Sequence, residues 1–223
     1  MQKFATTAPV TAVLDIPAGR IQLIAADRDD TTVEVRPADA GKNRDLKAAK
    51  EIEVSYHDGV LRVVAPAAKH RLLGHSGSVE ITVQLPAGSR VQAKAADTDL
   101  RGVGRLGEVT LEAAQATVKL DEADSADLTL QAGPVTIGRL TGPAEISTLK
   151  GDLHITEAVR GTLTLRTEYG QITVGAARGT SATLDAGTTY GRIDNALQNS
   201  DGATAALTVH ATTAYGDITA RSL

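Results

Sequence analysis

The residues of this chain that could do chemistry are acids and tyrosines that recur at similar places in related segments. Asp152 and Asp217 each follow a glycine in two similar hexapeptides. Two carboxyl groups held within roughly 5–10 Å of each other are the usual machinery for cleaving a glycosidic bond. Tyrosine rings could instead bind a sugar or a protein by stacking. Either chemistry depends on how the related segments place these side chains.

Four segments carry the repeated pattern, and three of the four tyrosines of the chain occupy one position in it. The segments begin at Thr148, Thr167, Thr188 and Thr213 and read TLKGDL, TEYGQI, TTYGRI and TAYGDI. Their starts are separated by 19 to 25 residues. A pattern that recurs at such a spacing is typical of stacked supersecondary units.

The aliphatic residue after the glycine position extends the pattern to the rest of the second half of the chain. The aligned residues are Leu100, Val118, Val135, Leu153, Ile172, Ile193 and Ile218. A second apolar column contains Leu111, Leu130, Ile146, Leu165, Leu184 and Val209. Each unit therefore has two short strands with a corner between them, and it is too short for a βαβ crossover of roughly 30 residues. We predict an all-β, single-stranded β-solenoid of about seven or more coils.

Glycine and acid positions follow from this arrangement. Gly151, Gly170, Gly191 and Gly216 are predicted structural corners, where positive φ or a close backbone approach requires glycine. If the coils stack in chain order, the acids at 152 and 217 lie three coils apart, about 14 Å along the axis. This distance is too long for a catalytic pair, so we predict no catalytic residues and no enzyme activity.

The first 88 residues read as strands and turns that begin or cap the solenoid. His57-Asp58-Gly59 joins 52–56 to 60–64 and predicts a hairpin. Residues 40–50 predict one helical turn or a loop, and 69–78 a loop. We expect two regions, 1–88 and 89–223, in one continuous domain, with the N-terminal region covering one end of the rod.

Composition restricts the function further. The chain has 223 residues, 42% of them hydrophobic, which suffices for a core. It has no cysteine, which excludes disulfides and thiolate metal sites. A net charge of −4 argues against a nucleic-acid partner. No apolar run approaches the length of a membrane span, and the N-terminus lacks a leader pattern. We expect a cytoplasmic protein, or an extracellular or cell-surface protein if a leader was removed.

The chain resembles a family of bacterial β-strand-repeat proteins described as putative adhesins, a domain of unknown function. The resemblance covers nearly the whole chain and rests on DIPAGRIQL at 15–23, VEITVQLPAG at 79–88 and the repeated Gly-Asp-Ile-like corners. It implies a single-stranded β-helix and brings no catalytic residues.

Two interpretations of the tyrosine position stay open. Tyr169, Tyr190 and Tyr215 either form an aromatic surface for a ligand or partner, or a ladder in which each ring packs on its neighbour. Lys150 takes the same position one unit earlier. The histidines are His57, His70, His75, His154 and His210. Only His70 and His75 are close in sequence, and we predict no metal and no cofactor.

These observations favour a non-catalytic β-solenoid scaffold or protein-interaction module. The alternative is a carbohydrate-binding or carbohydrate-processing β-helix that uses the tyrosine surface. The chain ends inside the repeat, at 216–223, so the last coil would leave an open strand edge. We expect a second copy, a partner protein or the N-terminal strands of the chain to cover this edge.

Overall fold

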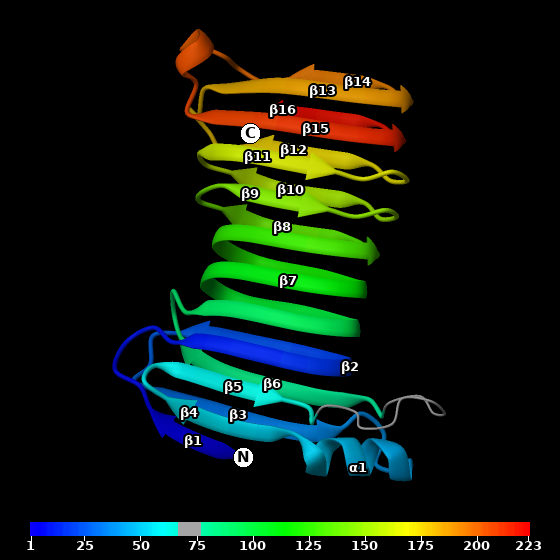
Figure 1. The fold of residues 1–223 in the computed structure, drawn as a ribbon. Helices are drawn as coiled ribbons and strands as arrows, with labels where there is room; N and C mark the ends of the chain where they lie inside the picture. Colours follow the sequence, from blue (N-terminus) through cyan, green and yellow to red (C-terminus); the bar gives the residue numbers. More distant parts are fainter. Residues whose placement is uncertain (67–76) are drawn as a thin grey trace.

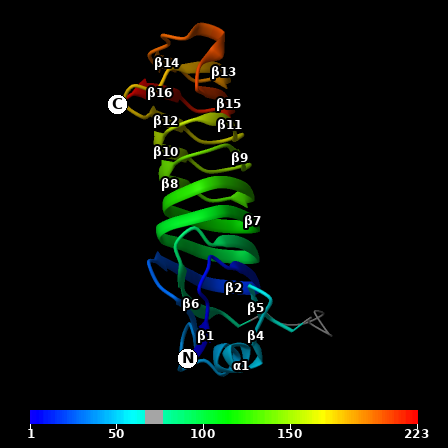
Figure 2. The same cartoon turned by 90° about the vertical axis from the view of Figure 1, so that its left-hand side faces the viewer.

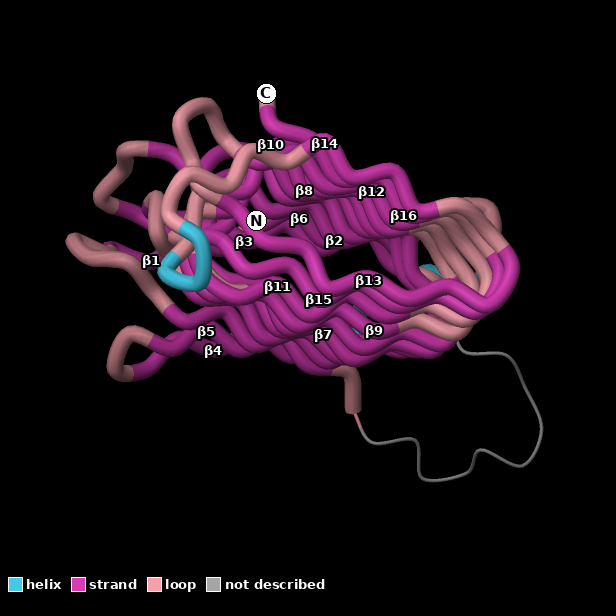
Figure 3. Tube along the Cα trace, turned by 90° about the horizontal axis from the view of Figure 1, so that it is seen from above, coloured by secondary structure: helices cyan, strands magenta, loops and turns pink. Residues whose placement is uncertain are grey.

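The computed structural model describes residues 1–66 and 77–223, which form a rod of stacked coils (Figure 1). Seen along its axis, the rod is a flattened β-solenoid in which strands of successive coils superpose (Figure 3). All its strands belong to one hydrogen-bonded sheet that does not close. The predicted β-solenoid is therefore confirmed. Most of the predicted loop at 69–78, with His70 and His75, lies outside the described residues.

Two broad faces make up the solenoid. One face contains, in spatial order, β6 (Val79–Pro86), part of β2 (Thr11–Ala26), parts of β7 (Arg90–Ala132), β8 (Val135–Leu140), β10 (Leu153–Ala158), β12 (Ile172–Ala176), β16 (Ile218–Ser222) and β14 (Ile193–Ala196). The other contains β5 (Val60–Val64), the remaining parts of β2 and β7, β9 (Ala144–Ser147), β11 (Gly161–Arg166), β15 (Leu207–Tyr215) and β13 (Ala182–Tyr190). Neighbouring strands of these two sets run parallel.

The aliphatic column predicted after the glycine position is present as a line of inward-facing residues. Paired strands align Val135 with Leu153, Leu153 with Ile172, and Ile172 with Ile218. These four side chains are at most 1% exposed. The column contributes one aliphatic side chain per coil to a thin interior, which explains how a chain with 2% aromatic residues forms a core.

The coils at the C-terminal end do not stack in chain order, and this corrects the sequence-based prediction. β16 lies between β12 and β14, and β15 lies between β11 and β13. The last coil of the chain, 207–223, is thus inserted beneath the coil that precedes it in sequence. The linker 197–206, with a 3₁₀ turn η1 at Gly202–Thr204, carries the chain back past the terminal coil. This extra path accounts for the long spacing of 25 residues before the last repeat.

At the N-terminal end, too, a coil lies between coils that are not its neighbours in sequence. The first coil of the chain, β2, pairs with β5 and β6 on one side and with β7 on the other. Both the first and the last coils are therefore enclosed by other coils. Apolar periodicity predicts which face of a strand is buried. It does not specify the order in which equivalent strands stack, so the sequence pattern could not predict this arrangement.

The second predicted apolar column has the wrong register in places. Ile146 pairs with Leu128 rather than Leu130, and Leu165 pairs with Ala211 rather than Val209. A shift of two residues keeps every side chain on the same face of a strand, so alternation alone cannot detect it.

The N-terminal end of the rod is covered by antiparallel strands and a helix (Figure 1). β3 (Asp30–Pro37) pairs with β6, and β1 (Gln2–Ala5) pairs with β3. β4 (Glu53–His57) forms the predicted hairpin with β5, through Asp58 and Gly59 at positive φ. The segment predicted as a helical turn or loop forms the helix α1 (Asn43–Glu51).

At the opposite end of the rod the strand edge belongs to β13 and β14, not to the C-terminal segment. The expectation that 216–223 forms an open edge is therefore wrong. The N-terminal strands lie far from this end, so they do not cover it (Figures 1 and 2).

Candidate functional site

The predicted tyrosine position forms a continuous stack at one corner of the last three coils. Isolated bridges join Lys150 to Tyr169 and Tyr169 to Tyr215, and the β13–β15 register aligns Tyr215 with Tyr190. The spatial order is therefore 169, 215, 190. The inserted last coil places its tyrosine in the middle of the stack.

Ring geometry shows what the stack presents to solvent. The rings of Tyr169 and Tyr215 lie 5.0 Å apart at 1°, and those of Tyr190 and Tyr215 lie 4.9 Å apart at 11°. The three residues are 53%, 47% and 63% exposed for Tyr169, Tyr215 and Tyr190, respectively. Because each ring covers the face of its neighbour, the exposed area along the stack consists of ring edges. Only the outer faces of the two end rings are not covered by another tyrosine.

Buried threonines fix the corner from inside. In the repeated hexapeptide, the hydroxyl of Thr167 donates to the carbonyl of Gly151 at 3.1 Å. Thr213 donates likewise to Gly170 at 3.1 Å. Each bond joins one coil to the glycine of the neighbouring coil. Thr148 has the same position, yet its buried hydroxyl has no partner among the described residues.

The glycines of the pattern lie where successive coils approach most closely. A Cβ atom on Gly170 would be 2.1 Å from the carbonyl oxygen of Gly151, and one on Gly216 would be 2.0 Å from that of Gly170. Gly151 and Gly191 are equally close to neighbouring glycine carbonyls. This contact leaves no space for a side chain at any of the four positions.

The acids after these glycines also bond between coils. Asp152 accepts the backbone N–H of Gln171 at 2.8 Å, and Asp217 accepts that of Arg192 at 2.8 Å. Only β12 lies between their strands, so they are two coils apart, about 10 Å, rather than three. Each carboxylate already bonds to its own neighbouring coil, and the arrangement does not converge on one point.

Other candidate acids and histidines are dispersed. Asp121 forms an ion pair with Arg101 at 2.7 Å, and His210 Nδ1 lies 3.2 Å from Asp185. Within residues 1–66 and 77–223, no cluster of three or more His, Cys, Asp or Glu side chains could hold a metal ion.

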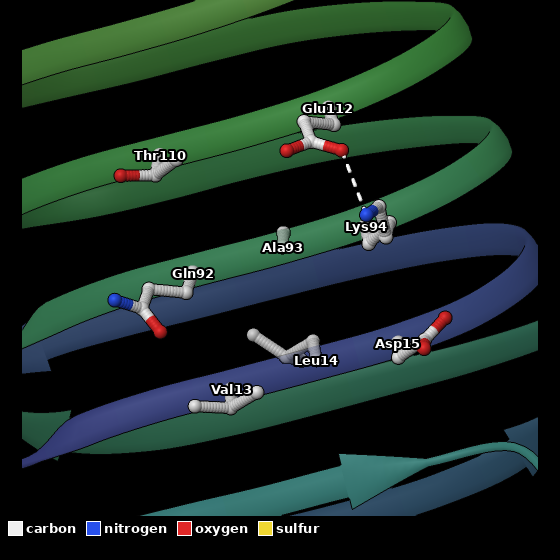
Figure 4. Close-up of a pocket in the computed structure, with 8 residues that line it drawn as sticks. All are labelled: Val13, Leu14, Asp15, Gln92, Ala93, Lys94, Thr110 and Glu112. Carbon is white, nitrogen blue, oxygen red and sulfur yellow. Dashed lines mark ion pairs between the residues drawn. The ribbon is translucent and has the colours of Figure 1, made fainter.

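A shallow depression on the broad face of β2 and β7 was not anticipated from the sequence (Figure 4). Its volume is about 280 Å³, and an adjoining depression of about 440 Å³ shares Lys94 and Glu112 with it. These two side chains form an ion pair at 2.8 Å. The hydrogen bond and charge of Glu112, with a smaller effect of Asp15, raise the pKa of Lys94. Because Lys94 and Glu112 pair with each other, Asp15 is the remaining charged side chain that lines the depression.

The sequence pattern that defines the Toastrack family, DUF4097, matches residues 13–222. This chain belongs to the Toastrack family. The match extends from β2 to β16 and so includes both inserted coils. Toastrack is a β-solenoid fold and a domain of unknown function, so the family resemblance seen in the sequence is confirmed.

Solved structures similar to this Toastrack chain have adhesin names. A putative cell adhesion protein from Clostridium sporogenes is 12% identical over 100% of this chain and 98% of that chain, with a TM-score of 0.41. A putative adhesin from Bacteroides fragilis is 12% identical over 98% of this chain and 95% of that chain, also with a TM-score of 0.41. No curated protein matches the sequence. Among the described residues of this Toastrack domain, no helix has the length and apolarity that a membrane span needs.

Proposed function

We propose that this protein is a non-catalytic, adhesin-like scaffold that works by protein interaction. The observation that carries this proposal is the use of the repeat's own polar residues. The threonine hydroxyls and the aspartates bond to the backbone of neighbouring coils. These recurring polar groups thus stabilise the stacking of the coils into a rod, and the tyrosine corner and the open end are the surfaces best placed to contact a partner.

A substrate screen tests the non-catalytic part of this proposal. The purified protein is incubated with a panel of polysaccharides and of chromogenic esters, and released reducing ends and alcohols are measured. We expect no turnover above that of buffer. Turnover that is lost in Asp152→Asn or Asp217→Asn, with the circular dichroism spectrum retained, would refute the proposal.

A second function, carbohydrate binding at the tyrosine corner, is favoured by one observation. Tyr190 is 63% exposed at the end of the stack, and its outer ring face is not covered by another tyrosine. Sugars stack on ring faces, so this face is the best platform in the stack. A glycan array tests it. Binding that Tyr190→Ala abolishes and Tyr190→Phe retains would support this function, whereas an array without hits would eliminate it.

A further inference from the structure

The terminal coil of the rod has an unpaired strand edge. Among the described strands, β13 pairs only with β15, and β14 pairs only with β16. All four residues of β14 are exposed, and Ile193, the last member of the aliphatic column, is 46% exposed. The other end of the rod is covered by β1, β3 and α1 (Figure 1). The edge strands of that end are β1, which pairs only with β3, and β4, which pairs only with β5, and they are four and five residues long. The two ends are therefore not equivalent, and β13 is the longest edge strand.

Hydrogen bonding identifies the free part of this edge. The N–H of Leu207 in β15 donates to the carbonyl of Ser181. Because alternate residues of a parallel strand bond to the same neighbour, the backbone groups of Leu184, Ala186 and Thr188 point away from β15. The N–H of Ala182 also points outward but donates to Gln198 in the linker. The free stretch thus runs from 184 to 188, with Ala186 at its centre.

The sequence protects this stretch only by one exposed charge, Asp185. Natural edge strands are usually blocked by proline, lysine, a bulge or a covering segment. β13 reads ATLDAGTTY and contains neither proline nor lysine. The linker 197–206 rises over one end of the coil only (Figure 1).

We propose that a second copy of this chain covers the edge, with β13 of each copy paired antiparallel about a two-fold axis at Ala186. This inference specifies the partner of the proposed scaffold and rests on that function. Antiparallel pairs must match outward-pointing residues with each other. A two-fold axis at Ala186 meets this requirement, because it pairs Leu184 with the partner's Thr188 and Ala186 with the partner's Ala186.

Side chains fit this register. Asp185 comes opposite the partner's Gly187, which has no side chain to clash with it. The half-buried side chains of Leu184 and Ala186 belong to the core layer, so pairing continues that layer from one rod into the next. A head-to-tail filament would have to pair β13 with β1 or β4, the edge strands of the N-terminal end. These strands are short and carry Lys3 and Glu53, and short length and charge both discourage edge pairing.

Charge favours a second copy over an unrelated strand. Arg192 follows the end of β13, and its side chain stays 90% exposed although it lies 3.5 Å from Asp217. Asp201 lies at the start of β13, where its N–H donates to the hydroxyl of Ser181 at 3.1 Å. An antiparallel arrangement brings the start of one β13 to the end of the other, so Arg192 of each copy approaches the partner's Asp201. The surface is therefore complementary to itself, as an isologous interface requires.

Disulfide trapping tests the register directly, because the chain has no cysteine. In Asp185→Cys/Gly187→Cys, each thiol faces the partner's thiol across a non-hydrogen-bonded pair with Cα atoms about 4.5 Å apart, within disulfide range. Mild oxidation should give a covalent dimer in about tenfold or greater excess over a control, because pairing raises the effective thiol concentration. The matched control is Thr129→Cys/Gln131→Cys, exposed residues with the same spacing on an inner coil.

Sedimentation of the untagged full chain provides the second measurement. Wild type should sediment as a dimer, and Ala186→Pro as a monomer with an unchanged circular dichroism spectrum, because the N–H at 186 does not bond to β15. A wild-type monomer at the highest attainable concentration, or trapping no greater than in the control pair, would overturn the inference. Either result leaves the substrate screen unaffected, so failure of the dimer and failure of the proposed function are distinguishable.

Discussion

The same substitution at two buried threonines of the repeat should change the stability of the protein in opposite directions. Thr213 and Thr148 are both buried, at 6% and 3% exposure. The hydroxyl of Thr213 donates to Gly170 at 3.1 Å, whereas that of Thr148 has no partner among the described residues. Valine replaces the hydroxyl by a methyl group of nearly equal volume, so the two substitutions differ mainly in the hydrogen bond lost.

The magnitudes follow from this difference. Thr213→Val removes a hydrogen bond with a net contribution of about 1 kcal/mol and leaves a carbonyl with one fewer donor. Thr148→Val removes a buried hydroxyl whose unpaired desolvation costs about 1–3 kcal/mol, so it should be neutral or stabilising by about 1 kcal/mol. For a chain of this size, 1 kcal/mol corresponds to about 2–4 °C in Tm. The Tm values of the two variants should therefore differ by about 4–8 °C at most.

Thermal unfolding followed by circular dichroism, with urea unfolding as a second measurement, provides the assay. Thr167→Val serves as a replicate of the bonded case, because its hydroxyl also reaches a glycine carbonyl. If Thr148→Val lowers Tm as much as Thr213→Val does, the threonine column acts through shape alone, and the bonding account of the corner is refuted.

Three further predictions concern the corner, the N-terminal strand and the coil order. Gly170→Ala should destabilise the protein by about 3 kcal/mol or more, measured by urea unfolding, because the new Cβ would lie 2.1 Å from a carbonyl oxygen. Asp30→Asn should flatten the loss of Tm on acidification. Hydrogen bonds from Lys3 and then from Arg28 lower the pKa of Asp30, so its contribution is present above the unfolded value of 3.8 and disappears as pH falls through the folded pKa. Thr173→Cys/Thr219→Cys should form an intramolecular disulfide, because the two residues are paired neighbours.

Matched variants make these results decisive. Within its own chain, Gly187→Ala meets no atom closer than 4.0 Å, so at a protein concentration low enough to keep the chain monomeric it should cost far less than the corner substitution. Lys3→Met removes one of the two cations and should reproduce part of the acid effect of Asp30→Asn. Thr173→Cys/Asp194→Cys joins coils that are neighbours in sequence but separated in space by β16, so it should not cross-link. Efficient cross-linking of that pair would show that the coils stack in chain order.

The sequence by itself determined the elements of this fold that depend on local pattern. Apolar alternation with a glycine corner at a short, regular interval specifies strands with one buried face, and such units can bury that face only by stacking. The column through Leu153, Ile172 and Ile218 could be predicted for this reason. The Asp58-Gly59 turn could be predicted because few residue pairs adopt its positive φ angles.

Only the tertiary structure decided the order of the coils, the register of the second column and the identity of the open edge. Equivalent coils present nearly the same aliphatic side chains, so exchanging two of them changes neither which residues are buried nor which strands alternate. The order depends instead on contacts specific to individual coils, such as the bond from the Arg192 N–H to Asp217, and on a linker long enough to pass the terminal coil. For this reason the edge that faces solvent belongs to β13 and β14, although the chain ends elsewhere.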